Sequence, residues 1–399
     1  MRSSWLLLVM LSGAAQAAWT WDEAQTLNSV QGAKIFPHIE SANRKGVALS
    51  GKRGEAAESI GVIWEDNRDG TPQCYLAIKP AAAAARFLPE QRVSQAECYE
   101  PVIVGLGGGR FVTAWEERGK VHARLWPDGR TIQLSDADAG QVTLAAGGGP
   151  LFAAWAEQAG RFRRIVVASL STARGALRVA HKAPVEAATP VDDQGYPALA
   201  VAGDGSVVVA WEDRRNRHTV PLVSFSSDGR TFGPPDRLTD RKSGSANGLG
   251  AGTGAMRPTL TAWGPRGIAA VWLDKRDFLS GYDVYAALDD GTRRFGRNLQ
   301  VQDSFGENMV QWHASVVANA SGRLLAVWDD ARDGTADVWL ADWTGERFGD
   351  NESVPAAAGK GEQSDPVAAL DAQGRLHLVW FDRDAQSGTR IRYVRGVPR

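Results

Sequence analysis

The sequence predicts an all-β protein, a closed propeller of seven four-stranded antiparallel blades, with six blades as the alternative. The first observation is a tryptophan that recurs about every 40 to 60 residues, a period typical of propellers and other repeat arrays. The second is an acidic residue two positions after each of these tryptophans. The third is that the copies divide into four strand-like runs separated by turn residues, as propeller blades do.

The repeated unit joins a short apolar run to a charged turn. Its tryptophans are Trp64, Trp115, Trp155, Trp211, Trp272, Trp328 and Trp380. The acids that follow them are Asp66, Glu117, Glu157, Asp213, Asp274, Asp330 and Asp382. Four copies add an arginine four positions after the tryptophan: Arg68, Arg215, Arg276 and Arg332. Catalysis needs a residue once, whereas this acid and arginine recur, so we interpret the unit as structural, with the acid paired to the arginine.

Strand boundaries follow from the turn residues, most clearly in the fourth unit. Runs at 196–201, 207–211 and 220–225 are separated by turns, and a fourth run covers 231–238. The next two units repeat the last two strands at 282–288, 294–301, 337–341 and 347–354. The last unit has runs at 366–370, 376–381 and 390–394 but no fourth strand. Residues 19–27 are therefore predicted to supply that strand and close the ring, which leaves no open sheet edge.

The first 17 residues have the pattern of a secretory signal peptide. Arg2 precedes an apolar run from Trp5 to Leu11, and Ala15-Gln16-Ala17 is a small-residue cleavage site. Residues 18–399 are then expected to form a single propeller domain in a soluble periplasmic or secreted protein, and we expect a monomer. No later run approaches the roughly 20 apolar residues that span a bilayer. The net charge of −1, with no basic stripe, argues against nucleic acid as a partner.

The two cysteines, Cys74 and Cys98, are candidates for a disulfide because export leads to an oxidising compartment. Two free thiols are the alternative. Metal ligands are not predicted. Residues 329–334 resemble the start of a calcium loop, but Ala331 and Leu340 stand where ligands are needed. The histidines include no zinc-like pair, and no cofactor is expected.

Asp-Gly turns between the third and fourth strands carry a family resemblance. The segment Ser226-Ser227-Asp228-Gly229-Arg230-Thr231-Phe232 resembles the Asp-box hairpin of sialidases and other BNR-repeat proteins, with one residue fewer between Asp and Gly. Residues 289–295 and 343–348 are weaker copies. The resemblance implies a sialidase-like propeller in which these boxes are structural.

The catalytic residues of that family do not all have counterparts here. Sialidases use three arginines on a substrate carboxylate, a tyrosine nucleophile with a glutamate partner, and an aspartate acid/base. Their first arginine lies in an Arg-Ile-Pro motif, where this chain has Ile35-Phe36-Pro37. Only Arg257, directly before Pro258, places an arginine at an equivalent point of any unit.

Candidate ligand-binding residues come from the starts of the innermost strands, near the propeller axis. The blade topology places these starts on the same face as the tryptophan-acid turns, and the Asp-Gly hairpins on the other. Unlike the repeated unit, residues there differ from blade to blade. They are His38, Tyr99, Glu100, Tyr196, Arg257, Trp312, His313 and Asp365. Polar and aromatic groups that converge on one opening are typical of a small-molecule site.

Two functions follow as hypotheses. The first is a non-catalytic module that binds a glycan or a protein partner across this face. The alternative is a glycoside hydrolase or lyase-like enzyme with Arg257 as carboxylate clamp and Glu100 or Asp365 as acid/base. The interblade links at 181–194, 239–256 and 303–311 are long, and the glycine-rich stretch 243–252 resembles a dinucleotide fingerprint only superficially.

Overall fold

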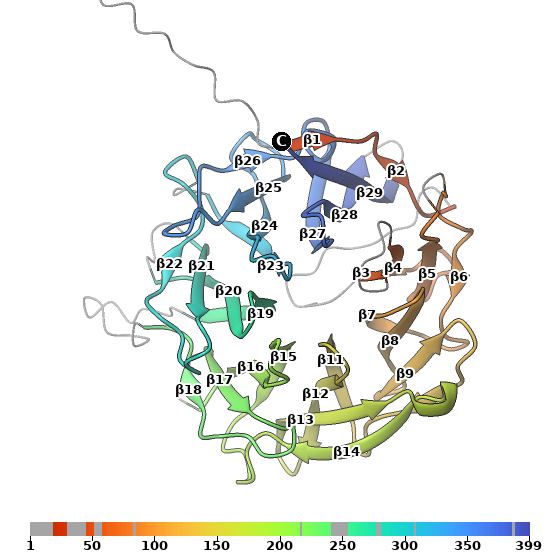
Figure 1. Cartoon of the computed structure of the whole chain (residues 1–399), viewed down its shortest axis with the longest axis vertical. Helices are drawn as coiled ribbons and strands as arrows, with labels where there is room; N and C mark the ends of the chain where they lie inside the picture. The colour runs from red at the N-terminus through yellow and green to blue at the C-terminus, as the bar shows by residue number, and fades with distance from the viewer. Residues whose placement is uncertain are drawn as a thin grey trace, which may run out of the picture.

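The computed structural model confirms seven blades of four antiparallel strands in a ring. It describes residues 19–29, 45–51, 58–82, 85–215, 218–240, 254–276, 281–306, 309–384 and 388–399. Figure 1 shows the sheets arranged radially, with β3, β7, β11, β15, β19, β23 and β27 as the innermost strands. In the described part of the chain, no helix has the length and apolar character needed to cross a membrane.

The first four blades follow one another along the chain. Blade I has β3 (Lys45–Ser50), β4 (Ser59–Asp66), β5 (Gln73–Lys79) and β6 (Gln91–Arg92). Blade II has β7 (Tyr99–Gly107), β8 (Arg110–Glu117), β9 (Lys120–Trp126) and β10 (Thr131–Gln133). Blade III has β11 (Ala139–Ala146), β12 (Leu151–Ala159), β13 (Phe162–Ser171) and β14 (Arg178–Pro184). Blade IV has β15 (Gln194–Val201), β16 (Val207–Asp213), β17 (Val220–Ser226) and β18 (Asp236–Arg237).

The remaining blades repeat the order. Blade V has β19 (Ala255–Trp263), β20 (Gly267–Asp274), β21 (Asp283–Asp289) and β22 (Leu299–Gln300). Blade VI has β23 (Gln311–Ala318), β24 (Leu324–Asp330), β25 (Asp337–Asp342) and β26 (Glu352–Ser353). Blade VII has β27 (Glu362–Leu370), β28 (Leu376–Asp384) and β29 (Gly388–Pro398). Two short 3-10 helices, η1 (Ala173–Gly175) and η2 (Pro355–Ala357), lie in the links.

The N-terminal segment closes the ring, as predicted. Strand β1 (Trp19–Trp21) pairs antiparallel with the end of β29, with Trp19 opposite Pro398. Strand β2 (Gln25–Thr26) pairs with the same strand further along. The last blade therefore receives its outer strand from the start of the chain, and Figure 1 shows β1 beside β29.

The outer strands are shorter than predicted. In blade IV only residues 236–237 pair with β17, not the whole of 231–238. The chain returns to β17 through one bond from the Gly233 N–H to the Phe225 carbonyl, after which Pro234 and Pro235 cannot donate ladder bonds. The link at 181–194 is also shorter than predicted, because β14 continues to Pro184.

The Asp-Gly hairpin of blade IV is held by its own side chains. The Asp228 Oδ1 accepts hydrogen bonds from the N–H groups of Arg230 (2.9 Å) and Thr231 (3.2 Å). These backbone bonds, with one from the Ser226 hydroxyl, lower the pKa of the exposed Asp228 carboxyl. Gly229 has φ +68°, a left-handed conformation that glycine adopts without strain. The turn is therefore stabilised by hydrogen bonds to its own Ser226 and Asp228 side chains.

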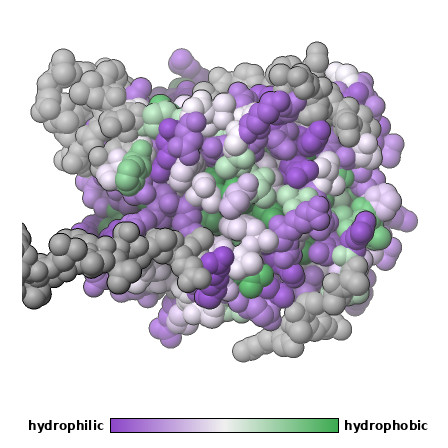
Figure 2. Space-filling view, turned by 90° about the horizontal axis from the view of Figure 1, so that it is seen from above, coloured by the Kyte–Doolittle hydropathy of each residue, from purple (hydrophilic) through white to green (hydrophobic). Residues whose placement is uncertain are grey.

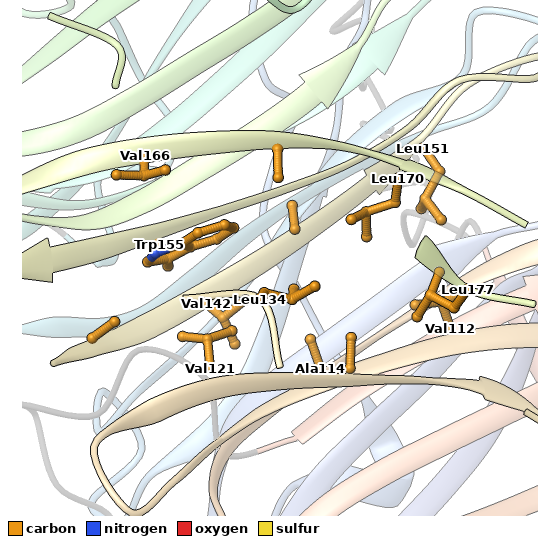
Figure 3. Close-up of a cluster of buried hydrophobic side chains, with 14 of the residues drawn as sticks. Val112, Ala114, Val121, Leu134, Val142, Leu151, Trp155, Val166, Leu170 and Leu177 are labelled. Atoms are coloured by element: carbon orange, nitrogen blue, oxygen red, sulfur yellow. The ribbon is translucent and has the colours of Figure 1, made fainter. Parts of the chain in front are cut away.

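The core lies between neighbouring blades. Every residue of β16 and of β24 is buried, which explains why these second strands are apolar over most of their length. Figure 3 shows one such layer, in which Trp155 and Val166 of blade III face Val121 and Ala114 of blade II. Each of the seven anchor tryptophans lies in a buried cluster of this kind.

A disulfide and a largely hydrophilic surface complete the description of the fold. Cys74 of β5 forms a disulfide with Cys98, which directly precedes β7, so the bond ties blade I to blade II. Both cysteines are fully buried. Figure 2, an edge-on view, shows mostly hydrophilic residues with smaller apolar areas between them.

Candidate functional site

The repeated tryptophan unit holds the turns at one end of the blades. All seven anchor tryptophans are fully buried. In six copies the indole N–H donates to the acid two positions later, at 3.0 to 3.3 Å. The predicted acid–arginine pair forms in all four copies that have the arginine. In the seventh copy Asp382 accepts a hydrogen bond from the Gln363 side-chain amide and lies 3.9 Å from Arg392.

The innermost strands share a bulge at the same end of the ring. In six blades the ladder between first and second strands shifts register there. One non-glycine residue in each bulge has a φ of 46° to 59°: Glu100, Gln141, Tyr196, Arg257, His313 and Asp365. Such left-handed conformations cost free energy and cluster at functional sites. We call these six positions the bulge ring.

A second set of side chains, which the sequence analysis missed, supports the bulge ring. The residue directly after the anchor tryptophan is a carboxylic acid in four blades: Glu65, Glu116, Glu212 and Asp329. Each of these accepts a hydrogen bond from the backbone N–H of the bulge residue in the next blade: Glu100, Gln141, Arg257 and Asp365, respectively. The sequence does show an acid directly after four of the anchor tryptophans. Its role becomes clear only from the bulge that it contacts in the structure.

The glycines before two bulge residues allow this approach. A Cβ on Gly140 would lie 2.7 Å from the Glu116 carboxyl oxygens. A Cβ on Gly195 would lie 2.7 Å from Oε1 of Gln141, which accepts the N–H of Tyr196 at 2.8 Å. In that blade Ala156 follows the tryptophan, and Gln141 supplies the acceptor that alanine lacks.

A cavity of about 210 Å³ opens among the innermost strands of blades III to VII. Five of the eight candidate residues line it: Tyr196, Arg257, Trp312, His313 and Asp365. Its remaining walls include Thr143 and apolar groups such as Leu273, Pro258 and Val367. We call this space the axial cavity.

Arg257 is held on both sides within the axial cavity. Its guanidinium lies 3.4 Å from the centre of the Tyr196 ring, and its Nη1 is 2.7 Å from the Glu212 carboxylate. Burial is the main cause that raises the pKa of Tyr196, while the adjacent Arg257 charge opposes it. The arginine thus already has a carboxylate partner, unlike a clamp that awaits a substrate carboxylate.

His313 belongs to a chain of charges that links blades VI, VII and I. Its Nδ1 is 2.7 Å from Asp329, and the same Asp329 oxygen accepts the Asp365 N–H. The Asp365 carboxylate is 2.6 Å from the ammonium of Lys45, which is buried against the Phe381 ring. Burial alone would lower the pKa of His313, but Asp329 and Asp365 outweigh it and raise that pKa.

Trp312 gives the axial cavity an aromatic wall. It is partly exposed, and its ring packs on Tyr282 with centroids 5.3 Å apart. Phe305, in the link before β23, is one of the most exposed large apolar residues among those described. A half-exposed indole beside polar groups is a common platform for the apolar face of a ring-shaped ligand.

The other candidate residues lie elsewhere. Tyr99 donates to Glu97 at 2.6 Å, and this bond is the main cause that raises its pKa to about 12. Glu100 belongs to blade II, outside the cavity walls, and its carboxyl lies close enough to that of Glu116 to affect its pKa. Burial is the main cause that raises the pKa of Glu116. His38 lies outside the described residues.

Within the described residues, no group of three or more His, Cys, Asp or Glu side chains is placed to hold a metal ion. The acids of the calcium-like segment have other partners. Asp329 contacts His313, and Asp330 accepts from Trp328 and pairs with Arg332.

Comparison with known proteins supports the fold. No protein-family profile and no curated protein sequence matches the chain. A solved protein of unknown function from Dyadobacter fermentans is similar, with a TM-score of 0.58, 12% identity, and coverage of 96% of this chain and 100% of that one. An α-L-arabinofuranosidase from Fusarium graminearum has a TM-score of 0.50 and 10% identity, and covers 92% and 98%. A fucose-specific lectin from Aleuria aurantia has a TM-score of 0.48 and 11% identity, and covers 83% and 99%. At these identities the likeness concerns the propeller fold.

Proposed function

We propose that this chain is a non-catalytic propeller that binds the end unit of a glycan in the axial cavity. The observation that carries the proposal is the cavity itself, with an aromatic wall at Trp312 and polar groups from Arg257, His313 and Asp365 around it. Its volume of about 210 Å³ is below the roughly 300–1,000 Å³ of sites for drug-sized ligands, so one sugar unit suits it better than a peptide surface.

We also propose that the protein acts outside the cytoplasm, after removal of residues 1–17 as a signal peptide, with 18–399 as one domain. The buried Cys74–Cys98 disulfide supports this location because such bonds persist in oxidising compartments.

A glycoside hydrolase stays the second candidate because two carboxyl groups, those of Glu100 in the bulge ring and of Glu116 next to it, interact with each other. Carboxyls this close to each other argue against it, since the two catalytic carboxyls of glycosidases are about 5 to 9.5 Å apart. A sialidase-like active site is also disfavoured, because it needs basic groups for a substrate carboxylate. Arg257 and Lys45 are each already paired with a carboxylate of the protein.

Glycan binding is tested with the mature chain on a glycan array, followed by calorimetry of the hits. Trp312→Ala should lower affinity for the best hit at least tenfold because it removes the aromatic wall. Trp343→Ala is the matched control, since that partly buried indole packs on Phe348 at the opposite face. Equal affinity in both variants would place the site elsewhere. Turnover of a chromogenic glycoside panel would favour the hydrolase.

A further inference from the structure

The axial cavity lies beside the one described bulge whose acceptor is missing. In the ladders of blades II and IV to VI, the residue before the bulge residue faces the position after the anchor tryptophan: Tyr99 with Glu116, Gly195 with Glu212, Met256 with Leu273, and Trp312 with Asp329. Leu273 therefore occupies the place of the repeated carboxylic acid. A leucine side chain has no acceptor to offer the N–H of the next bulge residue, His313.

Two other positions also lack the acid, and both differ from this one. At Ala156 the neighbouring Gln141 amide oxygen accepts the Tyr196 N–H instead. At Phe381 the ring lies under the Lys45 ammonium, 3.8 Å from it, and the bulge that would follow lies outside the described residues. Of the three positions without the acid, only Leu273 lines the axial cavity, together with Trp312 and His313.

We infer that a ligand oxygen takes the place of the missing carboxylate and accepts a hydrogen bond from the His313 backbone N–H. This inference rests on the proposed glycan-binding function and deepens it, since it identifies the atom of the protein that positions the sugar. Five other bulge residues donate this N–H to a side-chain oxygen from within the protein. The sixth donor, His313, has the same left-handed conformation, with φ 50°, and is part of the cavity lining.

The ligand oxygen belongs to an uncharged sugar. The basic groups nearest to this position are already neutralised, because Arg257 is paired with Glu212, Lys45 with Asp365, and His313 with Asp329. A carboxylate ligand would lose its hydration without gaining a new cation, which is costly in a buried site. A hydroxyl group accepts the N–H and loses much less on burial. The apolar face of the same sugar would pack on Trp312.

The experiment restores the repeat at the blade V position. Leu273→Glu introduces the acid found in four other blades, and Leu273→Gln introduces the amide acceptor that Gln141 already provides in blade III. Leu273→Met keeps the size and apolar character without an acceptor. Binding of methyl glycosides of neutral hexoses and pentoses, and of methyl glucuronide as the carboxylate match, is measured by calorimetry on all four proteins.

We expect the Glu and Gln variants to bind the neutral glycosides at least tenfold more weakly than wild type, and the Met variant to stay within about twofold. Wild type should bind the glucuronide more weakly than the matched glucoside. Unchanged affinity in both acceptor variants, or tighter binding of the glucuronide, would overturn the inference and leave glycan binding intact. If wild type binds no glycoside, the proposed function itself fails.

A second measurement does not depend on a ligand. Because Gln at 273 can accept the His313 N–H, the His313 amide hydrogen should exchange with solvent more slowly in Leu273→Gln than in Leu273→Met, measured by NMR. Equal or faster exchange in Leu273→Gln would overturn the inference independently of any sugar.

Discussion

Two adjacent positions in each blade have opposite roles. In six blades the residue two places after the anchor tryptophan accepts a hydrogen bond from the indole of its own blade, and in four it pairs with an arginine of the same turn. In four blades the residue one place after the tryptophan supports the bulge of the next blade. The first position is acidic in every copy, while the second varies. The position that repeats has a structural role, and the position that varies is where we propose the ligand binds.

The largest effect should come from the scaffold. Trp328→Ala removes a fully buried indole and its bond to Asp330, so it should lower the free energy of unfolding by about 3–5 kcal/mol. Trp312→Ala at the axial cavity should cost much less stability, since that side chain is partly exposed. Urea unfolding of both variants measures the difference. Similar losses in the two would break the distinction between scaffold and site.

A smaller effect is expected where the bulge ring meets its supporting acid. Gly140→Ala places a Cβ against the Glu116 carboxyl, which must move and release the Gln141 N–H, at a cost of about 1 kcal/mol. Gly148→Ala is the control in the same blade, because a Cβ there meets no atom within 4 Å. Equal unfolding midpoints for these variants would mean that the bond contributes nothing to stability.

The smallest effect concerns pH. The pKa of His313 is raised in the folded state, so its stabilising contribution is complete below the unfolded value of about 6.5. That contribution is lost as pH rises through the raised pKa. Wild-type stability should therefore fall more between pH 6 and 9 than that of His313→Gln, measured as the urea midpoint at each pH. Parallel profiles would contradict the assigned shift.

Much of the architecture was readable from the residues. The spacing of Trp64 through Trp380 predicted seven blades, and the missing last strand predicted closure by residues 19–27, both of which the structure confirms. Strand ends were less accurate. In blades IV to VI a glycine, Gly233, Gly296 or Gly349, bonds back to the third strand before the short outer strand begins, and blade IV adds Pro234 and Pro235. Hydrophobic patterns do not report this hydrogen-bond geometry.

The candidate site was only partly predictable from the sequence. Residues that do not repeat near the axis could be picked out, and five of them meet in one cavity, while Tyr99 turns to Glu97. That Arg257 is neutralised by Glu212, from the neighbouring blade, depends on ring geometry.

Leu273 shows where local sequence stops being informative. As an apolar residue after a buried tryptophan it looks like ordinary core, and composition gives no reason to single it out. Leu273 stands out only when the strand registers of the blades are compared. In four other blades the same position carries an acid that accepts a hydrogen bond from the backbone N–H of the bulge residue in the next blade. The chain encodes its repeat through periodic burial, which is local. The bulge contacts join residues 25 to 55 positions apart, and they exist only once neighbouring blades have packed together.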